Sequence, residues 1–187
     1  RGAAPEEALR RVFGYPAFRG LQEVAIRHVV DGGDALVLMP TGGGKSLCYQ
    51  VPALCRPGTA VVVSPLIALM RDQVRALTEA GVPAAALTSG NSEDENAEVL
   101  RALSARALRL LYIAPERLAS GATVPMLRRA GVQAIAVDEA HCVSQWGHDF
   151  RPDYLRVGEL RRALGVPLAA FTATADAETR EIGRAHV

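Results

Sequence analysis

The sequence has 187 residues, which is near the usual size of one domain with a single hydrophobic core. Hydrophobic residues make up 49% of the chain, but no apolar run approaches the roughly 20 residues that span a bilayer, so we expect no membrane partner. The formal net charge is only +1, which gives no general sign of a nucleic-acid partner. Any contact with DNA must therefore be local.

The cysteine content argues against a disulfide framework. Cys48, Cys55 and Cys142 are an odd number and form no Cys-x-x-Cys pair, so reduced thiols inside the cell fit best. A zinc site at Cys142 with His141 and His148 is disfavoured, because no second cysteine lies nearby and the spacing matches no usual ligand pattern.

Both ends of the chain indicate a fragment of a longer protein. The first residue is Arg1 rather than Met, the opening segment has no apolar signal core, and Thr179–Val187 reads as a helix. We expect the protein to be cytoplasmic, associated with the nucleoid if the source is bacterial and nuclear if the source is eukaryotic.

Apolar and β-branched runs alternate with helical stretches along the chain. The runs predict buried strands at Ala35–Met39, Ala60–Ser64, Ala84–Thr88, Leu108–Ile113, Ala134–Val137 and Leu168–Phe171. Helices are predicted at Gly20–Val30, Lys45–Leu54, Leu66–Ala80, Ser92–Ser104, Val124–Ala130 and Asp153–Leu164. Ser92 and Glu95 form a capping box at the start of the fourth helix. The alternation predicts an α/β domain with a parallel sheet covered by helices on both faces, and with its ligand at the carboxyl ends of the strands.

A glycine-rich turn with a single lysine follows the first strand. It reads Pro40-Thr41-Gly42-Gly43-Gly44-Lys45-Ser46 and leads into a helix. Such a turn directs backbone N–H groups at a phosphate, Lys45 would reach the β- and γ-phosphates, and the Ser46 hydroxyl would coordinate Mg²⁺. Lys45 is the only lysine among the 21 basic residues. Met39 stands where the strict motif has glycine, so a turn that only caps the helix is the alternative.

Two adjacent acids leave the sheet at the end of another strand. Asp138 and Glu139 follow Ala134–Val137 and open the run Asp-Glu-Ala-His, which ends at His141. An acid in this place, beside a phosphate loop, can hold the Mg²⁺ that bridges phosphate oxygens, which is the role expected of Asp138. Glu139 would orient or deprotonate the attacking water. Two acids alone would be solvated charge, but together with Lys45 they predict a hydrolase.

These residues resemble the superfamily 2 helicases, and the surrounding sequence narrows the resemblance to RecQ-family DNA helicases along nearly the whole chain. The resemblance implies the first RecA-like lobe of an ATP-dependent motor that uses ATP and Mg²⁺. It implies 3′-to-5′ movement on single-stranded DNA and unwinding of forked DNA in repair and recombination. It further implies a second RecA-like lobe with an arginine finger in the same chain, and we expect a monomer. The implied catalytic residues are Lys45, Asp138, Glu139 and His141.

The segment before the first strand resembles the family's adenine-recognition motif. It comprises Phe13-Gly14-Tyr15 and Phe18-Arg19-Gly20-Leu21-Gln22. By that similarity Tyr15 would stack on the base, Gln22 would hydrogen-bond its edge and Arg19 would support the pocket. An aromatic face and a two-sided amide suit adenine, and Gln22 would favour ATP over GTP. The alternative is a small aromatic cluster under the first helix.

Two segments resemble motifs that contact the DNA backbone. Ser64 begins the run Ser-Pro-Leu-Ile-Ala-Leu-Met-Arg-Asp-Gln, and its hydroxyl and the following N–H groups could donate to a phosphate. Arg117 lies in Tyr112–Leu118 and would supply a positive charge. The alternative for both segments is an ordinary turn between a strand and a helix.

The segment Cys142–Tyr154 is the most specific part of the resemblance. It contains Trp146, the only tryptophan, and Phe150, both among loop-forming residues rather than in a periodic core segment. Aromatic side chains in such a loop can stack on unpaired bases. In RecQ-like helicases this loop senses single-stranded DNA and signals to the hydrolytic site, which implies DNA-binding roles for Gln145, Trp146, His148, Phe150 and Arg151. The alternative is packing of the aromatics against the next helix.

The last strand ends in Phe171-Thr172-Ala173-Thr174-Ala175, which resembles the motif that couples hydrolysis to lobe movement. Thr172 and Thr174 would supply its hydroxyls. A plain strand end with a helix cap at Asp176 is the other interpretation.

Two other classes of protein were considered. A small P-loop kinase or GTPase is disfavoured because neither asparagine, Asn91 nor Asn96, lies in an Asn-Lys-x-Asp guanine-binding run. A non-catalytic DNA-binding module would have little reason to retain Lys45, Ser46 and the two acids together.

Overall fold

Seven strands form one sheet within the residues that the computed structural model describes, which are 3–40, 44–140, 152–174 and 182–183. The sheet order is β3-β4-β2-β5-β6-β1-β7, and β1 to β6 are parallel to their neighbours. The strands are β1 (Ala35–Pro40), β2 (Thr59–Val63), β3 (Ala84–Leu87), β4 (Leu110–Ile113), β5 (Val132–Val137), β6 (Leu168–Thr174) and β7 (Ile182–Gly183). The six expected strands are all present, with ends that differ from the expected ones by up to three residues.

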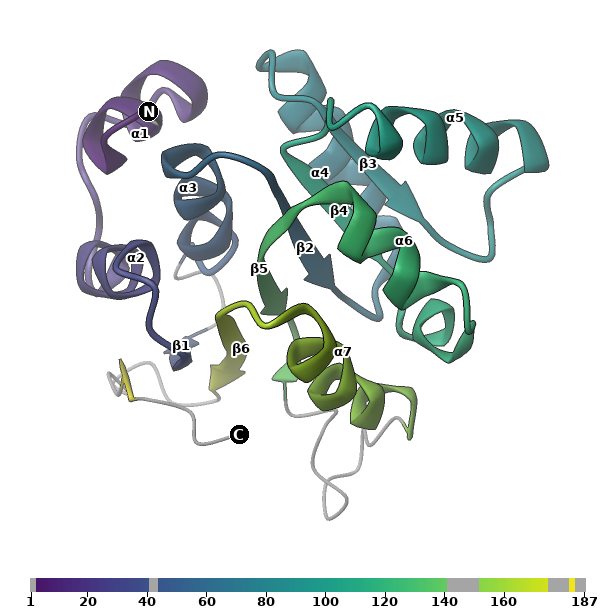
Figure 1. Ribbon diagram of the computed structural model, residues 1–187. Coiled ribbons are helices and arrows are strands. Elements are labelled where there is room, and N and C mark those ends of the chain that lie inside the picture. The colour runs from purple at the N-terminus through teal and green to yellow at the C-terminus, as the bar shows by residue number, and fades with distance from the viewer. Residues whose placement is uncertain (1–2, 41–43, 141–151, 175–181, 184–187) are drawn as a thin grey trace.

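Helices cover both faces of the sheet, as predicted. One face carries α1 (Pro5–Phe13), α2 (Gln22–Val30), α3 (Leu47–Cys55) and α4 (Ile67–Glu79), and the other carries α5 (Glu93–Ser104), α6 (Thr123–Ala130) and α7 (Arg156–Leu164). Figure 1 shows α2 and α3 on one side of the strands and α6 and α7 on the other. Successive strand residues point to opposite faces, so Val62 belongs to one core cluster while Val61 and Val63 belong to the other.

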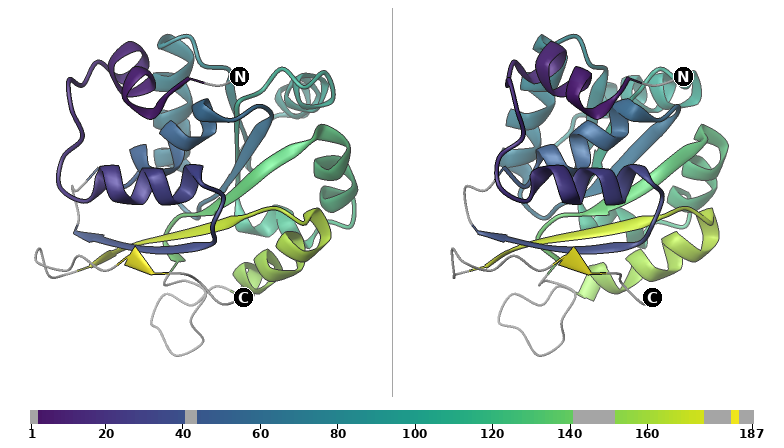
Figure 2. Two further views of the ribbon diagram at one scale, coloured as in Figure 1. Left: turned by 60° about the vertical axis from the view of Figure 1, so that its left-hand side comes forward. Right: turned by 90° about the vertical axis from the view of Figure 1, so that its left-hand side faces the viewer.

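The α2–β1–β6–α7 layers are clearest from the side. Figure 2 shows β1 and β6 running alongside each other, with α2 on one side of them and α7 on the other. No helix among the described residues is long and apolar enough to cross a membrane. Of the cysteines in the described part of the chain, Cys48 and Cys55 carry free thiols.

The antiparallel strand β7 corrects the expectation of a helix over Thr179–Val187. Within the described part of that range, Ile182 and Gly183 pair with Val37 and Leu36 of β1. Without β7 the outer N–H and C=O groups of β1 would lie at an open sheet edge. Pairing with β7 covers two residues of that edge, Leu36 and Val37. The sheet is therefore parallel through six strands and antiparallel at one edge.

Two further elements differ from the sequence-based expectation. The helix α1 was not predicted, although it begins with proline, followed by two acids in its first turn, and ends at Gly14, whose φ of +74° is the left-handed cap that glycine favours. The helix expected at Asp153–Leu164 begins instead as a 3₁₀ turn, η3 (Pro152–Leu155), and continues as α7. The capping box of α5 is confirmed, since Ser92 Oγ accepts from the Glu95 N–H at 3.1 Å and Glu95 Oε1 accepts from the Ser92 N–H at 3.2 Å.

Candidate nucleotide-binding site

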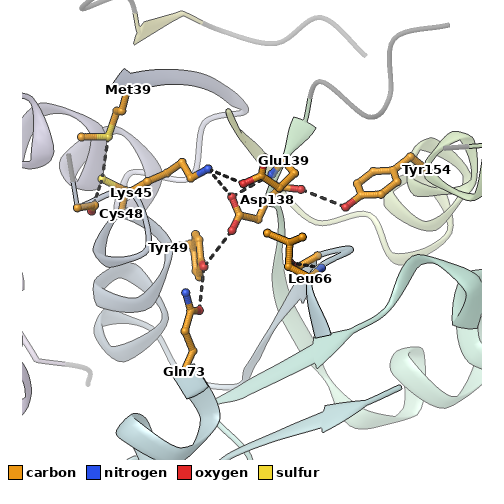
Figure 3. Close-up of polar contacts among 11 residues, drawn as sticks. Met39, Lys45, Cys48, Tyr49, Leu66, Gln73, Asp138, Glu139 and Tyr154 are labelled. Carbon is orange, nitrogen blue, oxygen red and sulfur yellow. Dashed lines mark hydrogen bonds and ion pairs between the residues drawn. The ribbon is translucent and has the colours of Figure 1, made fainter. Parts of the chain in front are cut away.

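The lysine and the two acids predicted from the sequence meet at the carboxyl edge of the sheet. Lys45 precedes α3, while Asp138 and Glu139 follow β5, and β6 lies between β5 and β1. Lys45 Nζ is 3.0 Å from Asp138 Oδ1 and 3.1 Å from Glu139 Oε1 (Figure 3). The Asp138 side chain is only 3% exposed, against 17% for Lys45 and 20% for Glu139. One cation thus lies between two carboxylates, and all three groups are largely screened from water.

The backbone and side chain of Asp138 are both held by hydrogen bonds. Its N–H donates to the Val63 carbonyl of β2 at 2.8 Å, and its own carbonyl accepts from the Tyr154 hydroxyl at 3.2 Å. Carboxylate Oδ1 accepts from the Glu139 N–H at 2.9 Å in addition to its ion pair with Lys45. A carboxylate this buried would be costly without such partners.

The backbone conformation of Glu139 brings both acids to the same lysine. Neighbouring side chains of a strand point to opposite faces, so Asp138 and Glu139 would diverge if β5 continued. Glu139 instead has a φ of +57°, in the left-handed region that a non-glycine residue rarely adopts, at a cost of roughly 1–2 kcal/mol. The turn out of the sheet lets Glu139 reach the Lys45 ammonium from the other side.

The Lys45 ammonium keeps its charge in this setting. Burial lowers the pKa of Lys45, but the Coulombic attraction and hydrogen bonds of Asp138 and Glu139 outweigh it, so the pKa lies above its ordinary value. The site therefore presents a fixed positive charge beside two oxygen ligands.

The geometry at Gly44 fits a loop that wraps a phosphate. Gly44 has a φ of +76°, and a Cβ there would overlap Nε2 of Gln22. Ser46 is half-buried, its side chain does not cap α3, and its carbonyl accepts the N–H groups of Tyr49 and Gln50. Thr41, Gly42 and Gly43, the remaining predicted cradle residues, lie outside the described residues.

The donor set also fits Mg²⁺ bound together with phosphate. In the described part of the chain no group of three or more His, Cys, Asp or Glu residues is placed to hold a metal. Mg²⁺ commonly takes one or two carboxylates and completes its shell with phosphate oxygens and water. Asp138 and Ser46 would supply the protein ligands, and the cation would polarise the phosphate.

A cavity of about 420 Å³ adjoins the phosphate turn. Its wall includes five of the six described residues predicted to bind the nucleotide, namely Tyr15, Arg19, Gln22, Gly44 and Ser46, while Lys45 does not line it. Phe13 and Phe18 pack against the hydrophobic core, whereas Tyr15 is 51% exposed, so the three aromatics do not form one buried cluster. The arrangement leaves Tyr15 at the surface for stacking.

Gln22 also has a structural role that the sequence did not indicate. Its Oε1 accepts from the Arg19 N–H at 2.7 Å, and its Nε2 donates to the Gly44 carbonyl at 3.4 Å. The buried amide therefore links the segment resembling the adenine motif to the phosphate turn. Its contact with an adenine edge stays a prediction.

The structure describes only some of the residues expected to contact DNA or to couple hydrolysis to lobe movement. Ser64 is buried, and its Oγ accepts the Leu66 N–H at 3.3 Å, so the hydroxyl stabilises the turn before α4. Arg117 lies in the 3₁₀ helix η1 (Pro115–Ala119), and its buried Nε has no hydrogen-bond partner within the described residues. Thr172 is half-buried at the end of β6, and the Thr174 side chain lies outside the described residues. The other calls outside them are His141, Gln145, Trp146, His148, Phe150 and Arg151.

A buried polar cluster beside Asp138 was missed by sequence reasoning. It consists of Tyr49 and Gln50 of α3, Gln73 of α4 and Tyr112 of β4. The available signal was polar residues inside apolar segments, such as Tyr-Gln within Leu47–Cys55. Their partners are far apart in sequence, so the signal alone did not pair them.

A parallel α/β sheet with a lysine-bearing glycine turn after β1 and an acid pair after β5, at the same edge, is the arrangement of a RecA-like nucleotide-binding domain. Residues 19–182 match the family model described as DEAD/DEAH box helicase. The chain belongs to the DEAD/DEAH box helicase family.

Several RecQ helicases are similar to nearly the whole chain. The "ATP-dependent DNA helicase RecQ" of Synechocystis is 50% identical over 184 residues, which cover 95% of this chain and 38% of that protein. The RecQ helicase of Bacillus subtilis is 48% identical, covering 94% of this chain and 30% of that protein. "ATP-dependent DNA helicase Q5" of Rattus norvegicus is 50% identical, covering 92% and 19%. The chain thus spans well under half the length of these relatives.

Solved helicase structures share the fold. The crystal structure of the DUF1998 helicase MrfA bound to DNA and AMPPNP superposes with a TM-score of 0.74 at 20% identity, covering 94% of this chain and 26% of that one. Another MrfA crystal structure gives a TM-score of 0.71. At this identity the likeness supports the fold.

Proposed function

We propose that this chain is the ATP-binding motor lobe of a RecQ-like DNA helicase, which couples ATP hydrolysis to 3′-to-5′ movement on single-stranded DNA and to duplex unwinding in repair and recombination. The observation that carries the proposal is the placement of Lys45 between Asp138 and Glu139, beside a cavity lined by Tyr15 and Gln22. The similarity to RecQ helicases over more than nine-tenths of the chain supports the choice of DNA as the substrate.

Each residue of the site has a distinct task in this proposal. Lys45 neutralises phosphate charge, and Asp138 with Ser46 would hold Mg²⁺, whose contribution would be to stabilise charge on the phosphate oxygens. Glu139 orients the attacking water and accepts its proton. Tyr15 stacks on adenine, Gln22 reads its edge, and Arg19 supports the pocket.

The proposal includes partners beyond this lobe. A second RecA-like lobe of the same protein closes over the nucleotide and supplies an arginine, and single-stranded and forked DNA bind across the two lobes. We propose that the protein acts as a monomer, at the nucleoid in a bacterium or in the nucleus in a eukaryote. Trp146 and its neighbours sense the single strand, a role that rests on the resemblance.

The test is the ATPase activity of the full-length protein with and without single-stranded DNA. Wild-type protein should hydrolyse ATP and be stimulated by DNA, and Lys45→Ala should abolish hydrolysis at every DNA concentration. Trp146→Ala should retain the basal rate and lose stimulation. Absence of hydrolysis by the wild type would refute the motor role, and undiminished stimulation in Trp146→Ala would refute the sensor role alone.

A further inference from the structure

A continuous buried polar cluster connects α4 with the carboxylate of Asp138. Tyr49 Oη lies 3.0 Å from Gln73 Oε1 and 3.5 Å from Asp138 Oδ2 (Figure 3). Tyr112 donates to Gln73 Oε1 at 2.6 Å, and Gln50 Nε2 lies 3.0 Å from Tyr112 Oη and 3.4 Å from Gln73 Oε1. Four of these five side chains belong to buried residues, so their donors and acceptors must be satisfied mainly within the cluster.

Two acceptors lie within reach of the Tyr49 proton, Gln73 Oε1 and the anionic Oδ2 of Asp138. Three donors, from Tyr49, Gln50 and Tyr112, approach Gln73 Oε1, but a carbonyl oxygen has only two lone pairs. Gln50 has a second acceptor in the Tyr112 hydroxyl and Tyr49 has one in Asp138, and a bond to a charged acceptor is the stronger kind. A half-turn of the Gln73 amide gives the same result, since Nε2 would then donate to Tyr49 and leave its proton for Asp138.

The position of the Tyr49 hydroxyl is fixed by packing. The Tyr49 ring meets Tyr112 edge-on at a centroid distance of 6.5 Å and Phe171 of β6 at 5.4 Å. Burial raises the pKa of Tyr49 well above its ordinary value, so the phenol keeps its proton and remains a donor. A rigid donor therefore faces Oδ2, while Oδ1 faces Lys45 and the Glu139 N–H.

We propose that Tyr49 is a positioning residue that holds the Asp138 carboxylate with Oδ1 toward the cation side, and that Gln73 competes for the Tyr49 proton. That this cation is Mg²⁺ bound with ATP rests on the proposed function. Gln73 lies on α4, which begins after the turn that Ser64 and Leu66 form, where DNA contact is predicted. Any displacement of α4 would change how strongly Gln73 competes, and through Tyr49 would alter how firmly Asp138 is held.

The test is the Mg²⁺ dependence of ATP hydrolysis by the full-length protein. Tyr49→Phe keeps the ring and removes the donor, so we expect the Mg²⁺ concentration at half-maximal rate to rise about tenfold, as loss of one hydrogen bond to a charged group allows. The KM for ATP at saturating Mg²⁺ should change little. If the Tyr49 hydroxyl only stabilised the fold, Tyr49→Phe would change the thermal midpoint without raising the Mg²⁺ concentration at half-maximal rate.

Three further variants separate positioning from packing. Tyr154→Phe is the matched control, because it removes a buried hydroxyl that contacts the Asp138 carbonyl rather than its carboxylate. Tyr112→Phe removes a donor to Gln73 Oε1, so Gln73 competes more strongly for the Tyr49 proton. The Mg²⁺ concentration at half-maximal rate should therefore rise, but less than in Tyr49→Phe. Gln73→Met removes the competitor, so the Tyr49 proton is left to Asp138 and the Mg²⁺ concentration at half-maximal rate should fall below the wild-type value.

The inference is overturned if Tyr49→Phe has a wild-type Mg²⁺ dependence, or if Tyr154→Phe shifts it equally. If the wild-type protein hydrolyses no ATP, the proposed function fails and the inference is tested by binding instead. Mn²⁺ binding in the presence of ADP, measured by electron paramagnetic resonance, should then be weaker in Tyr49→Phe than in Tyr154→Phe. Equal or absent Mn²⁺ binding in the two variants would reject the positioning role.

Discussion

At the scale of single residues, Gly44 illustrates how a turn and a binding residue depend on each other. Its left-handed backbone, with φ at +76°, brings the chain against Gln22, whose amide donates to the Gly44 carbonyl. Any side chain at position 44 would therefore meet both backbone strain and the Gln22 amide. Substitution of a second glycine that has the backbone strain but no neighbouring side chain separates these two effects.

Gly44→Ala should weaken nucleotide binding by about five- to tenfold, because displacement of Gln22 costs one buried hydrogen bond of about 1–1.5 kcal/mol. Gly81→Ala is the matched control, since Gly81 has a φ of +85° and nothing within 4 Å of an added Cβ. Both variants should be destabilised by backbone strain, as thermal denaturation would show. Equal nucleotide affinities of the two variants, measured by fluorescence titration, would contradict the role of Gln22.

Lys45→Met should destabilise the fold by about 3 kcal/mol, because it leaves the buried Asp138 carboxylate without its cation. The double variant Lys45→Met with Asp138→Asn should recover part of that loss in urea denaturation. A double variant no more stable than the single one would show that the pair does not couple.

The same ion pair gives a pH dependence with a defined sign. The pKa of Lys45 is raised above its ordinary 10.5, so the folded state holds this proton more tightly than the unfolded chain. The contribution of Lys45 to stability is complete below pH 10.5 and is lost as the pH rises through the raised pKa. The wild type should therefore lose its stability advantage over Lys45→Met in this alkaline range, and a constant advantage would contradict the assignment.

Sequence reasoning found the charged residues of the site because each follows a recognisable strand. Parallel strands end at one edge, so Lys45 after β1 and Asp138 after β5 were expected on the same edge; the strand order, with only β6 between them, comes from the structure. The Tyr49–Gln73 contact could not be found in this way, since it depends on the relative rotation of α3 and α4. Nor could a sequence show that Gln22 would bond to Gly44.

At the scale of elements, the six strands of the parallel sheet were predicted, whereas the helix α1 near the start of the chain and the strand β7 near its end were not. Runs such as Ala60–Val63 are buried throughout β2, and such continuous apolar runs mark parallel strands. The helix α1 was missed although Ala8, Leu9, Val12 and Phe13 lie at helical spacing and are buried or pack on the core. The strand β7 has two residues, too few for any periodicity, and exists through its pairing with β1.

Ser92→Ala tests an element that the sequence did specify. Loss of this N-cap should cost about 1 kcal/mol and lower the thermal midpoint by about 2–4 °C. Ser104→Ala, at the exposed last residue of the same helix, should leave the midpoint nearly unchanged. Equal midpoints for the two variants would mean that the capping box contributes nothing.

At the scale of the whole molecule, the sheet places its chemical groups along one edge. The ends of β1 and β5 carry the charged site, and β6, which ends in Thr172 and Thr174, lies between them. In the proposed function a second lobe faces this edge. Hydrolysis would then require groups from both lobes.

If a second lobe supplies a transition-state arginine, as proposed, this chain by itself should hydrolyse ATP at least about 10³-fold more slowly than the full-length protein, because such an arginine contributes on the order of 10³–10⁵ in rate. The comparison requires steady-state ATPase measurements of both proteins at saturating Mg²⁺ and single-stranded DNA. Circular dichroism of the shorter protein would establish that it is folded. Rapid, DNA-stimulated turnover by this chain alone would contradict the prediction.

The left-handed backbone of Glu139 places stability and activity in opposition at one residue. Glycine at position 139 would relieve the roughly 1–2 kcal/mol of conformational strain but would remove the carboxylate that pairs with Lys45. Selection for thermal stability alone would therefore favour loss of the proposed general base. A non-glycine residue in this conformation is what a site maintained for chemistry, rather than for robustness of the fold, would be expected to keep.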